Sequence, residues 1–233
     1  MKGFSILLST VAIIIASVSL VMSTKTSGGK GSVEAALKEN PKMVMDAIQA
    51  FQDQQRIAQE QAAAESLKKM SDDKNGIFVG PEKAAVTVVE FFDFSCGYCK
   101  RLAPAVEKVI ADNPDVKFVF KPVSFVSPVS PYQAKASVAA FKQGKFAEFY
   151  KGVMEYNGRM TEASVDEIAT SIGLDMDKYK KDLNSEEVSS LLAEVSSLSH
   201  NIGITGVPAL YVNGKQAAAY SAEEIQNVIN AAK

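Results

Sequence analysis

Residues 90–104 read EFFDFSCGYCKRLAP and contain both cysteines of this 233-residue chain, Cys96 and Cys99, in a C-x-x-C spacing. The residues directly before them, VTVVEFF at 86–92, form a β-branched apolar run of strand length, which is typical of a buried central strand. The residues after them predict a helix that ends before Asn113 and Pro114. Its apolar face consists of Leu102, Val106, Val109 and Ile110. The two cysteines therefore lie where a buried strand passes into a helix.

A second strand is predicted directly after this helix. Residues 115–123 read DVKFVFKPV and alternate between apolar and polar side chains until Pro122 interrupts the pattern. Strand, helix and strand together form a β-α-β unit. Its two strands are expected to be parallel and joined by a right-handed crossover.

The position of Cys96 at the start of a helix has a chemical consequence. Unpaired backbone N–H groups and the positive end of the helix dipole stabilise an anion there, so they favour the thiolate of Cys96. Cys99 lies one turn further along on the same face and is expected to be more buried. We interpret the pair as a redox couple in which Cys96 attacks a disulfide and Cys99 resolves the mixed disulfide.

Other uses of a C-x-x-C motif fit the composition less well. A structural zinc ion needs four ligands, whereas the chain has two cysteines and one histidine, so no metal site is predicted. Covalent haem attachment requires a histidine after the second cysteine, and Lys100 occupies that position. A purely structural disulfide remains an alternative, although such a small loop would add little stability.

The second half of the chain has a different pattern. Residues 130–200 are helical in character and contain no strand candidate. They are followed by GVPALYVNGK at 206–215, which predicts a short strand after Pro208 and a hairpin turn at Asn213-Gly214. A second short strand and a helix capped by Ser221 complete the chain.

These motifs resemble a known family. Residues Cys96–Pro104 are similar to the thioredoxin active-site helix, including the lysine after the second cysteine and the proline five residues beyond it. In thioredoxin relatives a cis-proline faces the reactive cysteine and the residue before it binds peptide through its backbone; Pro208 and Val207 match these positions. A helical insertion at about 130–198 resembles that of the DsbA family of bacterial periplasmic disulfide-bond proteins. The resemblance covers residues 76–233 and implies an α/β thioredoxin fold that needs no cofactor.

The resemblance also implies roles for residues around the cysteines. Glu90 matches a buried acid that is thought to shuttle protons near the resolving cysteine, and Lys121 matches a lysine that pairs with that acid. We further expect Phe94 and Tyr98 to be exposed and to border a hydrophobic groove for unfolded polypeptide. The active-site motif would then consist of the two cysteines with Gly97 and Tyr98 between them.

The direction of catalysis is less clearly indicated. The Gly97-Tyr98 dipeptide replaces the Pro-His of DsbA, removes a cationic neighbour and is the dipeptide of the isomerase DsbC. Val207 before Pro208 instead resembles DsbA. We favour a protein disulfide isomerase or reductase, with a DsbA-like dithiol oxidase as the alternative. The contrasting class is a noncatalytic periplasmic chaperone or surface protein with a structural disulfide.

The N-terminal residues predict export. Lys2 is followed by an uncharged stretch to Thr24, so we interpret residues 1–23 as a signal peptide or a signal anchor. The protein is accordingly expected in the periplasm, either released or held at the inner membrane by an uncleaved segment. That oxidising compartment permits disulfide chemistry.

Residues 24–75 predict a helical segment between the leader and the thioredoxin-like part. The composition from 32 to 70 is rich in alanine, glutamine, glutamate and lysine, and Asn40-Pro41 is a helix start. Val44, Ile48 and Phe51 make a thin apolar stripe. This segment is predicted to form a homo-oligomer through residues 32–70, a helix docked on its own domain, or a stalk.

The charge composition indicates which classes of partner the protein can bind. The net charge of −2 and the isoelectric point near 5.6 offer no broad basic field, so nucleic acid is not an expected partner. The expected partners are reduced or misfolded exported proteins and a membrane or periplasmic thiol redox protein.

Overall fold

The computed structural model describes residues 39–71 and 76–233. The chain divides into two compact units, residues 1–56 and 57–233. The predicted leader at 1–23, like every other feature before residue 39, lies outside the described residues. Across 39–71 and 76–233, no helix combines the length and the apolar character that crossing a membrane requires.

The described part of the first unit is the beginning of helix α3 (Pro41–Ser71). The helix starts at the proline that the sequence places at its first position, as predicted. The side chains of Met45, Ile48 and Phe51 are exposed to 64%, 46% and 61%. Of the predicted stripe, Ile48 and Phe51 are therefore exposed within the unit, whereas Val44 is half-buried.

The last turns of α3 belong to the second compact unit, residues 57–233. Leu67 is only 1% exposed and is part of a hydrophobic cluster on one face of the sheet. Its buried neighbours in that cluster are Val89, Phe91, Val119, Val123, Val195, Leu198, Ala209 and Tyr211. A leucine near the end of α3 thus helps to close the core, which extends the compact unit towards the N-terminus.

A five-stranded sheet forms the centre of the second unit. Its strands are β1 (Ile77–Val79), β2 (Thr87–Phe92), β3 (Lys117–Pro122), β4 (Ala209–Val212) and β5 (Lys215–Ala217). They are ordered β1-β3-β2-β4-β5; β2 and β3 are parallel and the other pairs are antiparallel. The predicted β-α-β unit is confirmed, with β2 in the middle of the sheet.

Strand β1 was not predicted, because its residues lie in a stretch whose turn-forming composition dominates. It is only three residues long, too short for an alternating pattern to be recognised, and it pairs antiparallel with β3. The ammonium group of Lys117 lies over the ring of Phe78 in this strand, 4.7 Å from the centre of that ring. A cation–π contact therefore accompanies the pairing of the two strands.

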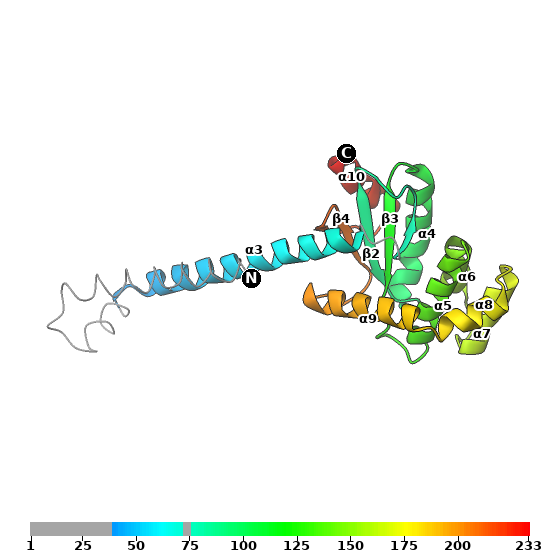
Figure 1. The fold of residues 1–233 in the computed structure, drawn as a ribbon. Coiled ribbons are helices and arrows are strands. Elements are labelled where there is room, and N and C mark those ends of the chain that lie inside the picture. The colour runs from blue at the N-terminus through cyan, green and yellow to red at the C-terminus, as the bar shows by residue number, and fades with distance from the viewer. Residues whose placement is uncertain (1–38, 72–75) are drawn as a thin grey trace. The chain divides into compact units, whose positions relative to one another are not determined.

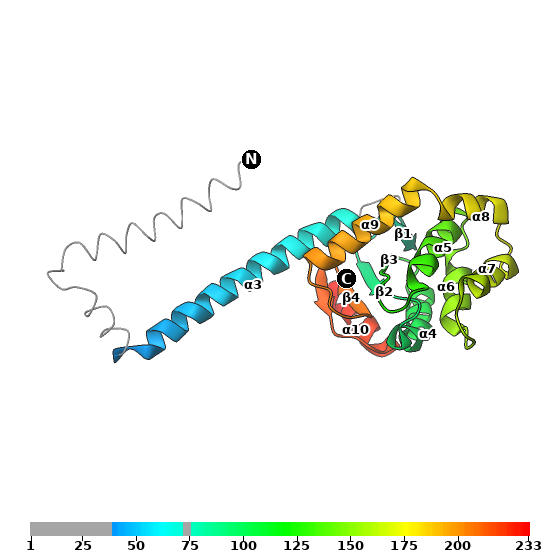
Figure 2. The same cartoon turned by 90° about the horizontal axis from the view of Figure 1, so that it is seen from below.

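Helices cover both faces of the sheet (Figures 1 and 2). Helices α4 (Gly97–Asp112) and α10 (Ala222–Ala232) pack on one face, where Val106 and Ile225 belong to the main hydrophobic cluster. The C-terminal part of α9 (Glu186–Asn201) packs on the other face through Val195 and Leu198. This layering is that of a thioredoxin fold, as predicted.

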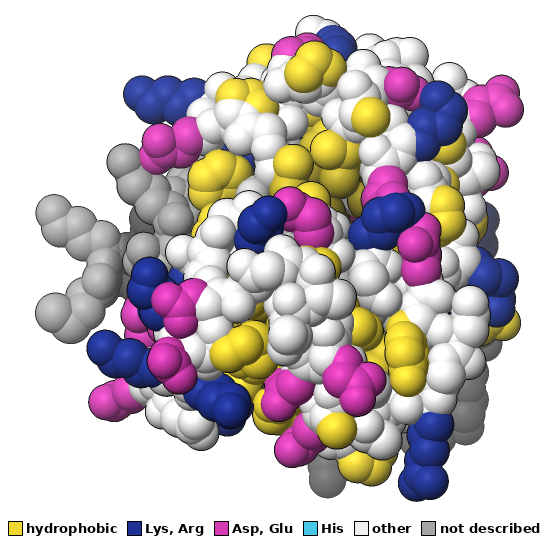
Figure 3. All heavy atoms as spheres, turned by 90° about the vertical axis from the view of Figure 1, so that its right-hand side faces the viewer, with side chains coloured by type: hydrophobic (Ala, Val, Ile, Leu, Met, Phe, Trp, Pro, Cys, Tyr) yellow, Lys and Arg dark blue, Asp and Glu magenta, His cyan; other side chains and the backbone are white. Residues whose placement is uncertain are grey.

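The predicted helical insertion is also confirmed. Between β3 and β4 the chain forms α5 (Ser130–Lys142), α6 (Phe146–Glu155), α7 (Glu162–Ser171), α8 (Met176–Leu183) and α9. Helix α7 begins with a complete capping box, in which the Ser164 and Thr161 side chains each accept a backbone N–H of the other residue. Acidic and basic side chains are interspersed on the face of the molecule that carries this insertion (Figure 3).

The turn between β4 and β5 has the predicted geometry. Asn213 and Gly214 both have positive φ angles, 47° and 80°, which a two-residue type I′ hairpin requires. The side chain of Asn213 also accepts the backbone N–H of Thr87 at 2.9 Å. The turn is thus attached to the start of the central strand β2.

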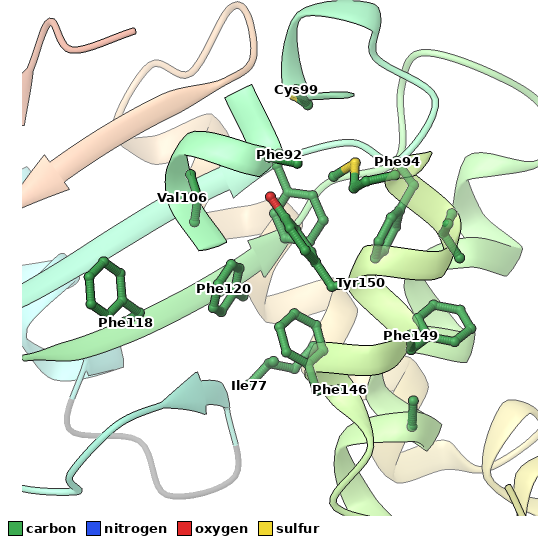
Figure 4. Close-up of a cluster of buried hydrophobic side chains, with 14 of the residues drawn as sticks. Ile77, Phe92, Phe94, Cys99, Val106, Phe118, Phe120, Phe146, Phe149 and Tyr150 are labelled. Carbon is green, nitrogen blue, oxygen red and sulfur yellow. The ribbon is translucent and has the colours of Figure 1, made fainter. Parts of the chain in front are cut away.

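Aromatic side chains join the sheet to the insertion (Figure 4). Phe92 at the end of β2 is fully buried, with ring centres of Phe94, Tyr150 and Phe120 at 4.9, 5.4 and 6.0 Å. Tyr150 comes from α6, so this cluster bridges two parts of the fold. The strand that leads into the C-x-x-C motif is consequently anchored to the insertion.

Candidate active site

The two cysteines occupy the first turn of α4. Cys96 is the N-cap residue, and its carbonyl oxygen accepts the backbone N–H of Lys100 at 3.0 Å. Both cysteines are free thiols, with Cys96 7% exposed and Cys99 fully buried. The prediction that Cys99 is the more buried of the two is confirmed.

The second motif meets the first at the sulfur atom of Cys96. The thiol of Cys96 donates to the backbone carbonyl oxygen of Val207 at 3.4 Å, and the peptide bond from Val207 to Pro208 is cis. Residues more than a hundred positions apart in the sequence are therefore in contact at the start of α4. The fold brings Cys96, Val207 and Pro208 together as the resemblance implies.

Cys99, also in the first turn of α4, is fully buried in an environment that favours its neutral thiol. Burial raises the pKa of Cys99 well above its usual range, and negative charge on Cys96 and on Glu90 raises it further. Among Cys96, Cys99 and Glu90, Cys96 is the most exposed, at 7%. Cys99 consequently needs a proton acceptor before it can act as a nucleophile.

Glu90 is the acid closest to this requirement. It lies on β2, is 2% exposed, and its Oε2 atom accepts a hydrogen bond from the hydroxyl of Tyr150 at 3.4 Å. Its other carboxyl oxygen has no hydrogen-bond partner within the described residues. Burial raises the pKa of Glu90 to about 8, only partly offset by the bond from Tyr150, so the carboxyl is mostly neutral at pH 7.

Comparison with known proteins places this geometry in a family. The family model described as Thioredoxin matches residues 72–231, which is more than half of the chain. The chain belongs to the thioredoxin family.

Curated proteins similar to this chain include a disulfide bond formation protein and an antiporter. The probable disulfide bond formation protein D of Bacillus cereus is 30% identical over 152 residues, which cover 60% of this chain and 70% of that protein. The Na(+)/H(+) antiporter NhaA 3 of Salinispora tropica is 30% identical over 139 residues, 59% of this chain but 21% of the antiporter. The chain thus spans about a fifth of the length of that antiporter.

Solved structures show the same fold. A thioredoxin-like oxidoreductase from Silicibacter pomeroyi is 29% identical, with a TM-score of 0.65, and the match covers 70% of this chain and 94% of that one. BdbD from Bacillus subtilis is 28% identical, with a TM-score of 0.60, covering 68% and 93%. A variant of Proteus mirabilis ScsC has the same fold at 23% identity and a TM-score of 0.68, and covers 89% of this chain and 96% of its own. The thioredoxin-family part of the chain therefore shares its fold with these three proteins.

Because the buried carboxyl of Glu90 is mostly neutral, we predict how its replacement changes the stability of the fold. Glu90→Gln should leave stability unchanged below about pH 4.5, where the glutamate is protonated in the folded and the unfolded chain alike. Between pH 4.5 and 8 the unfolded wild type ionises while the folded protein keeps its proton, so wild-type stability falls with rising pH. The variant should therefore be the more stable at pH 8, by on the order of a few kcal/mol.

Urea unfolding of both proteins at pH 4.5, 6 and 8 measures this difference. Glu167→Gln, at an exposed position of α7, is the matched control and should follow the wild type at every pH. Parallel pH curves for wild type and Glu90→Gln would show that Glu90 is ionised in the folded protein.

The expected pairing of Lys121 with Glu90 is wrong. In the parallel register of β2 and β3, Glu90 is opposite Phe120 and Lys121 is opposite Phe91. Because neighbouring residues of a strand point to opposite faces, Glu90 faces α4 and Lys121 faces the cluster that contains Leu67. The lysine of the family pattern therefore has no counterpart beside Glu90 at this position.

The exposure expected for Phe94 is also wrong, whereas the exposure expected for Tyr98 is confirmed. Phe94 is 1% exposed, and its ring centre lies 5.8 Å from that of Phe149 in α6. The insertion covers this residue, which a pattern of neighbouring residues does not reveal. Tyr98 is 69% exposed, and the guanidinium of Arg101 lies 4.3 Å from its ring centre.

Sequence reasoning missed Asp93, three residues before Cys96. This aspartate is completely buried, and its carboxylate accepts hydrogen bonds from residues of the active-site loop, the β3–α5 connection and the start of α5. A single acidic residue between two phenylalanines, directly before a C-x-x-C motif, was the available signal. The contact of Lys100 was also not foreseen: its ammonium group donates to the backbone carbonyl of Tyr156 at 2.9 Å.

A pocket of about 200 Å³ lies beside the cis peptide bond. Its walls are Pro208, Ala209, Leu210 and residues 216–220. Within the described residues, no group of three or more histidine, cysteine, aspartate or glutamate side chains is placed to hold a metal ion. At Cys96 itself the thiol meets the carbonyl of Val207, and the pocket begins at the next residue, Pro208.

Proposed function

We propose that the protein is an exported thiol-disulfide oxidoreductase that exchanges disulfides with client proteins. The observation that carries this proposal is the position of Cys96, the more exposed of two free thiols, at the start of a helix and against the carbonyl of Val207. A helix start favours the attacking thiolate, and the neighbouring backbone can align an extended client chain. The relatives named as disulfide bond formation proteins support the same reaction class.

In the reducing direction the steps balance as follows. The Cys96 thiolate attacks one sulfur of a client disulfide, forming a Cys96–client disulfide and releasing the other client sulfur as a thiolate. Cys99 then loses its proton and attacks the Cys96 sulfur, which forms the Cys96–Cys99 disulfide and releases the client's second thiolate. Two electrons pass from the protein to the client, and oxidation of a client reverses both steps.

Glu90 is proposed to take the Cys99 proton in this second step. With a pKa of about 8, its carboxyl can accept a proton when ionised and return it near neutral pH. The mutual electrostatic influence of Glu90 and Cys99 supports this role. Val207 and Pro208 are proposed to hold the client strand, with the adjacent pocket receiving one of its side chains.

Isomerisation and reduction are proposed in preference to oxidation. The Gly97-Tyr98 dipeptide supports this direction, as does the uncovered apolar stripe of α3, which favours assembly of several copies through residues 32–70. A DsbA-like dithiol oxidase is the alternative, supported by Val207 before the proline. Release into the periplasm, or attachment there by residues 1–23, is part of the proposal, and the mass of the exported protein distinguishes the two.

The reduction potential tests the proposal as a whole. A catalytic pair should equilibrate with glutathione, whereas a structural disulfide lies below about −300 mV. A potential that low would leave the noncatalytic chaperone or surface protein as the better reading. Refolding of scrambled ribonuclease, compared with oxidation of reduced ribonuclease, then decides between isomerase and oxidase.

Assembly through α3 makes a separate prediction. Replacing both Ile48 and Phe51 by serine should convert the oligomer to monomers, because it removes the exposed apolar side chains proposed to meet between copies. Sedimentation equilibrium measures the mass, and scrambled-ribonuclease refolding should slow by about tenfold if several copies must act together. Gln54→Ser, an exposed polar position on the same helix, is the control. An unchanged mass in the double variant would refute assembly through this stripe.

A further inference from the structure

The buried carboxylate of Asp93 connects three separate segments of the chain. Its Oδ1 atom accepts the backbone N–H of Ser95 and the hydroxyl of Ser130, both at 2.8 Å. Its Oδ2 atom accepts the backbone N–H groups of Phe125 and Val126, both at 3.1 Å. Four donors thus surround one carboxylate that has no exposure to solvent.

The same residue also holds the reactive cysteine. The main-chain carbonyl oxygen of Asp93 accepts the backbone N–H of Cys96 at 2.9 Å. Its side chain therefore fixes residues 125–126 while its main chain fixes the start of α4. The Phe125–Val126 segment is consequently attached directly to the active-site loop, and a further bond from Val123 N–H to Phe92 O at 2.8 Å keeps it alongside β2.

The side chains of this segment point away from the core although its backbone is anchored. Phe125 is 55% exposed and Val126 is 45% exposed, which is unusual for large apolar side chains in this unit. The surrounding sequence, residues 123–134, contains no charged residue. Tyr98, two residues after Cys96, adds a third exposed apolar side chain.

We propose that Asp93 is a positioning residue that holds Phe125 and Val126 beside Cys96 as a contact surface for apolar side chains next to a client's cysteine. This inference rests on the proposed disulfide exchange. Its occupant is an extended polypeptide segment with an apolar residue near its own cysteine. An uncharged surface, fixed by main-chain hydrogen bonds next to the reactive sulfur, suits such a segment because it imposes no charge pattern and loses little freedom on binding.

The side chain of Asp93 accordingly acts on client binding, whereas its contacts with the two cysteines come from its main chain, which Asp93→Asn keeps. An aspartate offers two acceptor oxygens, whereas an asparagine of the same size offers one, and its NH₂ group cannot accept a backbone N–H. Asp93→Asn should therefore break the hydrogen bonds of one carboxylate oxygen, either those from Ser95 and Ser130 or those from Phe125 and Val126. In the wild type the hydrogen bonds to Asp93 should protect the amides of Phe125 and Val126 from hydrogen exchange, and both amides should exchange faster in the variant.

Two disulfide-linked peptides provide the test, one with phenylalanine and leucine beside its cysteine and one with serine and glycine at the same positions. For the wild type we expect kcat/KM to favour the apolar peptide by about tenfold, the scale of one partly buried aromatic side chain. The preference should approach unity in Asp93→Asn and in Phe125→Ser combined with Val126→Ser. The equilibrium with glutathione should change by less than about twofold in both variants.

Phe51→Ser is the control, since it removes a phenylalanine of similar exposure from the other unit. Any loss of assembly that it causes should affect both peptides alike and keep the peptide preference. A retained preference in the Phe125/Val126 variant overturns the inference, and so does rapid exchange of the two wild-type amides, even if Asp93→Asn fails to fold. A shifted glutathione equilibrium with retained preference in Asp93→Asn also overturns it. A wild type that exchanges with glutathione but treats both peptides alike refutes this inference alone, whereas one that never exchanges refutes the proposed function too.

Discussion

Replacing Cys96 by serine should lower disulfide exchange with clients by at least about a thousandfold, the effect expected when the nucleophile of a covalent mechanism is removed. Cys96 is the only one of the two thiols with any exposure, and its sulfur lies against Val207. The buried Cys99 cannot replace it, because burial keeps its thiol protonated. Reduction of a disulfide-linked peptide, followed by mass spectrometry, measures the loss.

Cys99→Ser is the informative counterpart of this variant. It should still attack the client through Cys96 but cannot release the mixed disulfide, so covalent complexes should accumulate in stoichiometric amounts. Glutathione resolves such complexes slowly, which gives the variant residual turnover. Covalent trapping by Cys96→Ser in place of Cys99→Ser would reverse the assigned roles of the two sulfurs.

Replacing Phe92 by alanine should reduce the free energy of unfolding by about 3–5 kcal/mol, which is typical for a large aromatic side chain removed from a packed core. Phe92 is fully buried, and three aromatic rings from β3, α6 and the active-site loop pack against it (Figure 4). The cavity left behind would separate the insertion from the strand that carries Glu90.

Urea unfolding followed by circular dichroism measures this loss of stability. Phe125→Ala is the matched control, because the same side chain is 55% exposed there and its removal should cost less than about 0.5 kcal/mol. A similar loss in both variants would mean that the aromatic cluster is not the link between sheet and insertion.

Much of the fold could be predicted because its signals are local. The apolar run before Cys96, the helical spacing after it and the alternation up to Pro122 each lie within a few residues of one another, and together they define the β-α-β unit. The hairpin at Asn213-Gly214 is equally local, since its backbone angles require those residue types.

The errors arise where distant segments decide the outcome. Phe94 follows a strand and looks as if it should border a groove, but α6 covers it from about 55 positions later in the chain. Lys121 shares a strand with residues opposite Glu90, yet a single position in the register sends it to the other face. Leu67 belongs to a helix that appears independent, although the sheet needs it to complete a core.

In the candidate site, too, residues with a local signal could be predicted and residues defined by distant contacts could not. The two cysteines, Pro208 and Glu90 were found because motifs and a family resemblance identify them. Asp93 carries no motif of its own, and its importance becomes visible only when the donors from residues 125, 126 and 130 converge on it.

The two outermost strands of the sheet, β1 and β5, are each only three residues long, and β5 begins with the exposed Lys215. Unpaired edges of a sheet template aggregation, and short edges with charged ends suppress it. In the proposed function the protein meets unfolded client chains, and long free edges would bind their exposed strands irreversibly. Because β1 and β5 offer so little free backbone, we expect lasting attachment of a client only through the covalent bond to Cys96, which disulfide exchange can reverse.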